Sequence, residues 1–301
     1  MKVPGILLLF FCAGLLSACD GNLPDSFSDE PEKEEIVLKL SSNLKQYAVT
    51  RTSPLPQQTE VGVFVPEYQC ATTTCDAAHS NVKFTADTSG GLSSENPMKL
   101  TEGGNYNVYA YSPFKKEAAD APEYIPYSHG DDVLGCPIPP AILKTNAHNC
   151  NVSLKFVHLT AQIQFIVRVS DESSLGSLNA MSVLRVEGFL PEARLNLTAG
   201  TLSVNGEPSE QSTVKAAANT DEAGKYQLVS SPVCFFVMPK DEQTLHLRVT
   251  HNGVTRTGTI RTSFQPGVSY TYTVRIDTES GLSTSVAITD WINRYESIDI
   301  N

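Results

Sequence analysis

Alternation of apolar and polar residues with a period of two is the pattern that most restricts how this chain can fold. The apolar members of the clearest runs are Ile36, Leu38 and Leu40; Val61, Val63 and Val65; Ile163, Phe165, Val167 and Val169; Leu245, Leu247 and Val249; and Tyr270, Tyr272, Val274 and Ile276. Successive side chains of an extended strand point to opposite faces, so each run has one face for a core and one for water. The pattern therefore predicts strands of antiparallel sheets.

Turn residues separate these runs. Asn252-Gly253 lies between two strand-like stretches, and Asn-Gly favours a two-residue hairpin because both residues accept a positive φ. A second hairpin is predicted around Ala199-Gly200. The one weak helical pattern spans Glu172–Ala180. We therefore predict an all-β protein built from sandwiches.

The first 19 residues have the layout of a bacterial lipoprotein signal. Lys2 precedes an apolar run at residues 6–16, which is shorter than the roughly 20 residues that span a bilayer. Small residues then lead to Cys19, an ending that resembles a lipobox. We predict a signal peptide at 1–18 and lipid attachment at Cys19, where acyl chains would hold the protein on the outer membrane. The alternative is an ordinary secretory signal with a chance cysteine.

The residues after the signal divide into a tether and a long body. Residues 19–34 are acidic, polar and interrupted by proline, which predicts a flexible tether. Such a stretch resembles the export tag of surface lipoproteins in some Gram-negative groups, and a plain solvated spacer is the alternative. The body is too long for one sandwich of about 100 residues. A change near residues 150–160 from loop-rich to strand-rich sequence predicts β-sandwich domains at 35–155 and 156–301.

The charge balance argues against a nucleic-acid partner. The chain carries 22 basic and 33 acidic residues, for a net charge of −11. An acidic surface repels phosphate backbones, and no basic stripe stands out.

Seven cysteines are present, of which Cys12 lies in the signal. An oxidising compartment allows disulfides, and the candidates are Cys70, Cys75, Cys136 and Cys150. Cys70 with Cys75 would close one loop and Cys136 with Cys150 another, but four cysteines allow three pairings. The fifth cysteine of the body, Cys234, stands in an apolar run and is predicted to be a buried, small apolar residue.

A metal site is a weaker alternative for the first cysteine pair. Cys70 and Cys75 have His79 and His148 as further ligands in the same part of the chain. Their spacing fits no standard zinc template, so we predict no metal.

The sequence contains no familiar catalytic signature. A nucleophile elbow, an H-E-x-x-H helix, a phosphate loop and a dinucleotide fingerprint are all missing. His129 beside Asp131 and Asp132 could be read as an acid–base or metal site, but a polar loop explains it better. His158 is flanked by strand residues and is predicted to be a hydrogen-bonded packing residue. We predict that the protein is not an enzyme and uses no cofactor.

Tyrosines suggest a second kind of surface. Tyr106, Tyr109 and Tyr111 stand in one strand-like run, and Tyr124 and Tyr127 follow in a loop. Exposed aromatic rings bind sugars, whereas strand tyrosines more often fill the rim of a β core. We favour the core and keep sugar binding as the alternative.

Three stretches together resemble the fimbrillin-like proteins of Bacteroides and Porphyromonas relatives. Tyr106–Phe114 resembles the family's "AY-x-P" strand end, and Leu154–Phe165 resembles its "F-x-H-x-x-A-x-I-x-F" hinge. Phe264–Val274 and then Val286–Trp291 resemble its "F-x-x-G-x-x-Y-x-Y" strand and closing "I-x-x-W". The resemblance covers roughly residues 35–295.

The resemblance implies two tandem transthyretin-like Greek-key β-sandwich domains that build, cap or anchor surface pili. Family members are exported as lipoproteins, and many are cut after a basic residue by a trypsin-like protease. The cut removes the first strand and opens a groove, which a strand from a neighbouring subunit fills by β-augmentation. The expected partners are other pilin-like subunits and, through the lipid, the outer membrane.

The family mechanism can be transferred to particular segments of this chain. Ile36–Leu40 is the predicted removable strand, and Arg51 in the polar loop after it is the predicted processing site, with Lys45 as the competing site. As donor strand, Ile292–Asn301 is short, which favours a tip, anchor or accessory subunit over a repeating stalk. A donor segment that begins earlier, around Leu282–Ile288, is the alternative.

We predict that the protein is a structural subunit of a cell-surface pilus, assembled by donor-strand β-augmentation and serving adhesion. The main alternative is a lipid-anchored surface module that binds a glycan or a host protein and does not polymerise. A secreted hydrolase is a third alternative.

Overall fold

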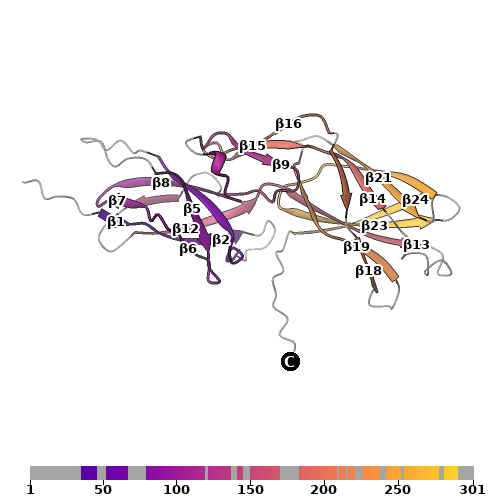
Figure 1. Ribbon diagram of the computed structural model, residues 1–301, viewed down its shortest axis with the longest axis horizontal. Coiled ribbons are helices and arrows are strands. Elements are labelled where there is room, and N and C mark those ends of the chain that lie inside the picture. Colours follow the sequence, from indigo (N-terminus) through magenta and orange to yellow (C-terminus); the bar gives the residue numbers. More distant parts are fainter. Residues whose placement is uncertain are drawn as a thin grey trace, which may run out of the picture. The chain divides into compact units, whose positions relative to one another are not determined.

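In the computed structural model, the described part of the chain is built mainly of β-strands (Figure 1). It describes residues 35–45, 52–66, 79–118, 121–136, 141–144, 150–169, 183–208, 210–214, 216–220, 226–237, 242–251, 254–277 and 281–290. Outside the described residues lie the predicted signal and tether (1–34), Cys19, Arg51, Cys70, Cys75, His148, Glu172–Ala180 and Ile292–Asn301. Residues from Glu34 onward form one compact unit.

The strands are short and follow one another closely. In chain order they are β1 (Glu35–Val37), β2 (Lys39–Lys45), β3 (Thr52–Ser53), β4 (Glu60–Val65), β5 (His79–Ala86), β6 (Gly91–Ser93), β7 (Lys99–Thr101), β8 (Asn105–Ser112), β9 (Ile125–Ser128), β10 (Leu134–Gly135), β11 (Ala141–Lys144), β12 (Asn151–His158), β13 (Ala161–Val169), β14 (Val183–Phe189), β15 (Glu192–Asn196), β16 (Thr201–Asn205), β17 (Glu210–Val214), β18 (Ala216–Thr220), β19 (Tyr226–Ser230), β20 (Val233–Phe235), β21 (Gln243–His251), β22 (Val254–Thr262), β23 (Val268–Asp277) and β24 (Gly281–Asp290). Within the described ranges, the single helical turn is η1 (Lys116–Ala118). The predicted all-β class is confirmed.

The first part of the chain forms a sheet that closes on itself. Its strands pair in the order β10-β12-β2-β6-β5-β4-β8-β11, with β3 beside β2. Because β10 also pairs with β8, the path of hydrogen bonds returns to its start. The buried side chains of these strands form a first core, which extends in sequence from Leu38 to Phe156.

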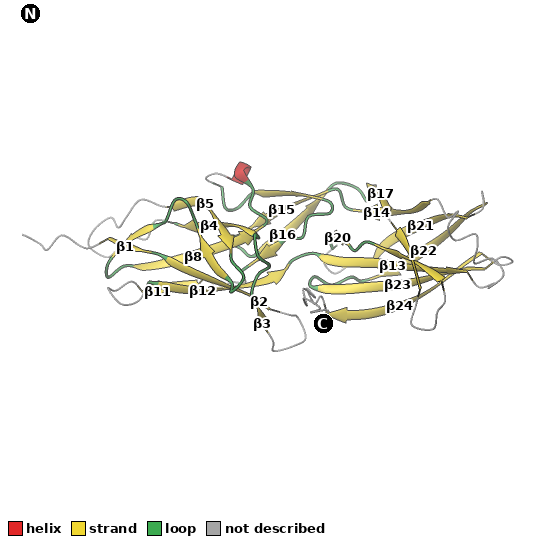
Figure 2. Ribbon diagram, turned by 60° about the horizontal axis from the view of Figure 1, so that its bottom comes forward, coloured by secondary structure: helices red, strands yellow, loops and turns green. Residues whose placement is uncertain are grey.

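Two facing sheets make up most of the second part (Figure 2). One has the order β18-β19-β13-β23-β24, with β20 beside β13, and the other has the order β17-β14-β21-β22. Side chains of both sheets share a second core, from Ala161 to Ile276 in sequence. The alternating residues of the sequence supply it: Ile163, Phe165 and Val167 are fully buried or nearly so, while Gln162, Gln164 and Ile166 between them are only partly buried.

A third core combines residues from both parts of the chain. β9 pairs with β15, and β15 pairs with β16, which gives a three-stranded sheet. The buried residues of this third core are Phe64, Tyr111, Ala118, Ile125, Tyr127, Val133, Leu190, Ala193, Leu195, Leu197 and Phe236. Strand pairing and apolar burial therefore connect segments that are far apart in the sequence. Ile125, for example, pairs opposite Leu195, about 70 residues later.

Strand direction differs from the sequence prediction in two places. The alternation was taken to indicate antiparallel sheets, but β2 runs parallel to β12 and β13 runs parallel to β23. Alternation reports which faces are buried and says nothing about the direction of the neighbouring strand. The direction depends on which distant segment lies alongside.

The predicted hairpins are confirmed. β15 and β16 pair up to Asn196 and Thr201 around the Ala199-Gly200 turn, where Gly200 has a φ of 65°. β21 and β22 pair up to His251 and Val254. The turn residues between them, 252–253, lie outside the described part.

Truncating one residue of the third core tests its contribution to stability. Leu195 is fully buried, so Leu195→Ala is expected to lower the free energy of unfolding by about 2–5 kcal/mol. The matched control is Arg194→Ala, on the exposed face of the same strand, which is expected to change it by less than about 0.5 kcal/mol. Guanidinium chloride unfolding measures both values. Equal midpoints for the two variants would contradict a stabilising core at this position.

Candidate assembly site

β2 is an internal strand of the first sheet. It pairs with β12 along a parallel register that extends from Lys39 opposite Asn151 to Leu44 opposite Phe156. On its other side β2 pairs with β6 and, at its end, with β3. The predicted removable segment, Ile36–Leu40, spans both β1 and the start of β2, because Leu38 breaks the strand and donates its N–H to the Met98 carbonyl at 2.9 Å.

The inner face of β2 is inserted into the first core. Leu40, Ser42 and Leu44 are only 6%, 2% and 2% exposed, and Leu38, directly before the strand, is 3% exposed. Lys39, Ser41 and Lys45 on the opposite face are exposed. Full burial of one leucine side chain contributes roughly 1.5–3 kcal/mol, so the three leucines account for much of the free energy that holds β2 in place.

Loss of β2 would create the two defects that a foreign strand can repair. The backbone of β12 would lose its ladder from Asn151 to Phe156, which leaves unpaired N–H and C=O groups. The sites of Leu38, Leu40 and Leu44 would become apolar pockets beside that edge. An extended segment with alternating apolar residues would satisfy both.

An open groove runs beside the start of β2. It has a volume of about 300 Å³, and its apolar lining comes from Leu38, Leu40, Phe84, Leu92 and Pro97. The pairing of β2 with β6 covers only Leu40 and Ser41, so the groove lies where the ladder between these strands ends.

β24 is the last strand of its sheet and is fully paired on one side. Its register with β23 extends from Gly281 opposite Asp277 to Asp290 opposite Val268. The alternative donor segment, Leu282–Ile288, lies inside β24. To serve as a donor, this segment would have to leave β23.

The "AY-x-P" motif has a structural role at the end of β8. The ring of Tyr111 packs on Gly62, where a Cβ atom would come within 2.2 Å of the ring. The Tyr111 hydroxyl donates to Asn81 Oδ1 at 2.7 Å and accepts from the Lys115 N–H at 3.2 Å. The aromatic residue therefore fastens the loop after β8 to β4 and β5.

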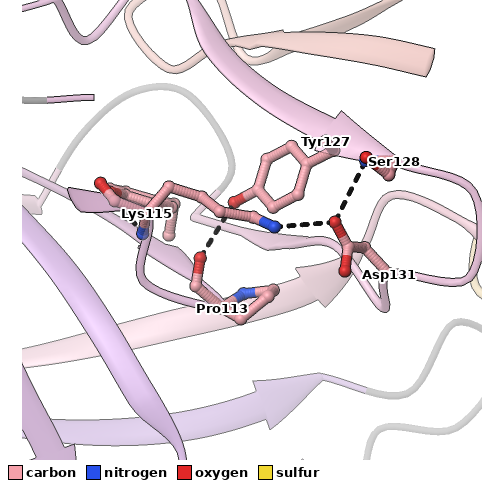
Figure 3. A network of polar contacts seen from close by, with 6 residues as sticks. Pro113, Lys115, Tyr127, Ser128 and Asp131 are labelled. Carbon is pink, nitrogen blue, oxygen red and sulfur yellow. Dashed lines mark hydrogen bonds and ion pairs between the residues drawn. The ribbon is translucent and has the colours of Figure 1, made fainter. Parts of the chain in front are cut away.

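A polar network continues from this loop to β9 (Figure 3). Lys115 Nζ lies 2.8 Å from Asp131 Oδ2, which also accepts the Ser128 N–H at 3.1 Å. Tyr127 donates its hydroxyl to the Pro113 carbonyl at 3.3 Å, and burial raises the pKa of this phenol well above its usual value. These contacts hold β9 in position to pair with β15.

The hinge motif contributes core residues on both sides of a buried histidine. His158 is buried, and its Nδ1 lies 2.8 Å from Asp132 Oδ1. The first core ends with Phe156 and the second begins with Ala161. The prediction that His158 is a hydrogen-bonded packing residue is confirmed.

The polar loop around His129 has separate structural partners. The ring of His129 stacks on Phe189 with centroids 4.6 Å apart, while Asp131 pairs with Lys115 and Asp132 pairs with His158. Among the residues that the structure describes, no three potential metal ligands come together. In those same ranges, no helix has the length and apolar character to cross a membrane.

Most of the tyrosines considered for sugar binding belong to the interior. Tyr106, Tyr111 and Tyr127 are buried, and Tyr109 is partly buried. Tyr124 is 64% exposed. The preferred interpretation, that strand tyrosines fill a β core, is confirmed for the three buried residues.

The described cysteines are free thiols. Cys136, Cys150 and Cys234 form no disulfide, so the bond considered between Cys136 and Cys150 is not present in this structure. Burial raises the pKa of the Cys136 thiol to about 12 and that of the Cys234 thiol still further. Cys136 packs against the first core and, like Cys234, is partly buried, so the full burial predicted for Cys234 is not observed.

A comparison with family models gives a match to the fimbrillin-like model over residues 49–291. The chain belongs to the fimbrillin-like family. The family is of a structural and adhesin type and is not a known enzyme class. Membership supports a pilus-related or adhesin-like role at the cell surface, in association with other pilus subunits.

A solved structure has the same fold, and two further solved structures are similar. A candidate cell adhesion protein from Bacteroides uniformis is 15% identical with a TM-score of 0.62, and the alignment covers 86% of this chain and 98% of that one. A candidate adhesin from Bacteroides thetaiotaomicron is 11% identical over 87% and 98%, with a TM-score of 0.47. The fimbrial anchor protein Mfa2 from Porphyromonas gingivalis is 10% identical over 85% and 97%, with a TM-score of 0.45. A search of curated proteins gave no match.

Labelling tests the burial of Cys136 in this fimbrillin-like chain. Only the thiolate reacts with iodoacetamide, and a pKa of about 12 leaves very little thiolate at pH 8. Cys136 is expected to react more than about 100-fold more slowly in the folded chain than in guanidinium chloride. Peptide mapping by mass spectrometry after timed labelling measures both rates. Equal rates would contradict the burial.

Proposed function

We propose that this fimbrillin-like protein is a subunit of a cell-surface pilus that accepts a strand from a neighbouring subunit in the place of its own β2. The observation that carries the proposal is the position of β2. The strand lies between β12 and β6, and together with Leu38 directly before it contributes three buried leucines to the first core. An adhesive tip, anchor or accessory subunit is the favoured role.

Processing at Arg51 would make β2 replaceable. Arg51 follows β2, which ends at Lys45, and it precedes β3, which begins at Thr52. In the intact chain β2 returns to its site as part of the same molecule, and the sheet path stays closed through β10. After a cut, only non-covalent contacts retain β2, so a competing strand at high local concentration can displace it.

The proposed lipid anchor at Cys19 and the proposed cut at Arg51 both involve the segment that contains β2. Lipid at Cys19 lies upstream of β2, so a cut at Arg51 leaves the lipid on the released segment. An uncut subunit would stay on the outer membrane as an anchor, while a cut subunit would be free to enter a pilus. The domains proposed at 35–155 and 156–301, each as a transthyretin-like sandwich, are supported by the separate first and second cores.

The alternative function is a lipid-anchored module that binds a glycan or host protein without polymerising. The closed sheet path of the intact chain favours it, since the edge of β12 that faces β2 is occupied while β2 is in place. The two functions differ in what a cut produces.

Limited trypsin treatment of the folded chain tests strand acceptance. The expected products are a new N-terminus at Thr52 and, after β2 leaves, higher-order assemblies seen by size-exclusion chromatography and electron microscopy. Arg51→Gln should prevent both products, whereas Lys45→Gln should leave them unchanged. A chain that is cut at Arg51 and never assembles, alone or with other pilus subunits, would favour the binding module.

Replacing Cys19 tests the lipid anchor. Cys19→Ala is expected to move the protein out of the membrane fraction, because the acylated thiol is lost. The control is Cys12→Ala, within the predicted signal peptide, which should remain membrane-bound. Immunoblots of fractionated cells give the result, and retention of the Cys19 variant would exclude this anchor.

A further inference from the structure

We propose that the β2 site selects its incoming strand at one position, the place now held by Ser42. The residue there must be small and carry a hydroxyl group, whereas the places of Leu38, Leu40 and Leu44 take larger apolar side chains. This inference rests on the strand exchange proposed above. The inference adds which residues the incoming strand must carry in order to bind.

Ser42 is the one polar residue on the inner face of β2, and it is fully paired. Its backbone N–H donates to the Gly90 carbonyl at 2.7 Å, and its Oγ donates to the same oxygen at 2.9 Å. Both bonds are buried. A strand that replaces β2 must supply the N–H in any case, and only Ser or Thr supplies the second donor.

The Gly90 carbonyl is held in place by its own turn. Asp87 Oδ1 accepts from the Ser89 N–H at 2.7 Å, from Ser89 Oγ at 2.7 Å and from the Gly91 N–H at 2.8 Å. The bonds from Ser89 and Gly91 lower the pKa of the Asp87 carboxyl, which therefore stays ionised at neutral pH. Gly90 has a φ of 84°, a conformation that favours glycine. The acceptor is thus part of a rigid turn that does not depend on which strand fills the site.

The turn at Gly90 packs closely against the backbone of β2. A Cβ atom on Gly90 would come within 2.7 Å of the Ser42 carbonyl oxygen and 2.9 Å of Pro54 Cβ. The backbones of β2 and the turn are therefore in direct contact, with Pro54 beside them. A valine in place of Ser42 would have the shape of threonine but would lack the hydroxyl donor to the Gly90 carbonyl. An aspartate would bring a buried carboxylate against the same carbonyl.

These contacts define a donor pattern. The fitting strand runs parallel to β12 and carries apolar residues at its first, third and seventh positions, with Ser or Thr at the fifth. Leu40, Ser42 and Leu44 of β2, with Leu38 directly before the strand, are the template. The partner is therefore a pilus subunit whose donor segment has this spacing.

Peptide exchange on the nicked, otherwise complete chain tests the pattern. The chain is cut at Arg51 while folded, and a fluorescent synthetic peptide of residues 36–45 is added as the probe. The peptide series carries Ser42→Ala, Ser42→Thr, Ser42→Val and Ser42→Asp. The matched control series carries the same four substitutions at Ser41, which lies next to Ser42 on the exposed face. Fluorescence anisotropy gives the affinity of each peptide.

The two series are expected to differ clearly. At position 42, Ala should weaken binding about fivefold and Val should bind about tenfold more weakly than its isostere Thr, because each lacks one buried hydrogen bond. Asp at position 42 should weaken binding more than about 100-fold. At position 41 every change should stay within about threefold.

The outcomes separate this inference from the strand exchange itself. If the unmodified peptide enters and both series give equal affinities, selection at Ser42 is wrong and the exchange stands. If no peptide enters the nicked chain, the exchange is wrong. In that case the same substitutions, made in the intact chain, test whether the site distinguishes between side chains at position 42. Their thermal midpoints should fall in the order Ser above Ala and Thr above Val at position 42, and midpoints as flat as those at position 41 would overturn the selection.

Discussion

The structure of the first sheet depends on the pairing of β2 with β12 on one side and with β6 on the other. One face of the strand, with Leu38 directly before it, places three leucines in the first core, and the backbone of β2 completes the ladder of β12. β2 and β12 each depend on the other for backbone hydrogen bonds. Without β2, the remaining strands would expose a backbone edge beside apolar surface, which is the combination that proteins avoid and that strand addition repairs. The same contacts that stabilise the intact chain therefore describe what a replacement strand must provide.

The third core explains why the chain from Glu34 onward is one compact unit. Tyr111 and the Lys115–Asp131 pair hold β9 in place, and β9 pairs with β15. Residues such as Ile125 and Leu195 are then buried together, although they come from different parts of the sequence. The motifs that mark the fimbrillin-like family thus include residues that shape this junction. The exchange proposed at β2 would leave the third core in place, because no residue of β2 belongs to that core.

Two sets of polar contacts in the described residues differ in what they stabilise. Lys115, Asp131, Asp132 and His158 are paired with one another close to the junction, and their contacts explain their presence without a reaction. Ser42 differs, because its partner is a backbone carbonyl in a rigid turn and the residue belongs to the strand proposed to leave. A buried hydrogen bond at an exchangeable position contributes to stability, and it also distinguishes one incoming strand from another.

The sequence alone determined the class of the fold and the inward-facing residues of many strands. Period-two alternation identified Leu38 and Leu40, Ile163 to Val167 and Tyr270 to Ile276 as core residues, because side-chain direction in a strand is a local property. The family motifs could also be recognised locally. Only the tertiary structure decided that β2 and β12 run parallel, that β10 closes the sheet, that Cys136 and Cys150 stay unpaired and that Ser42 meets Gly90. Each of these four features depends on contacts between segments that are far apart in the chain. The spacing of residues within one segment does not indicate which distant segment lies beside it.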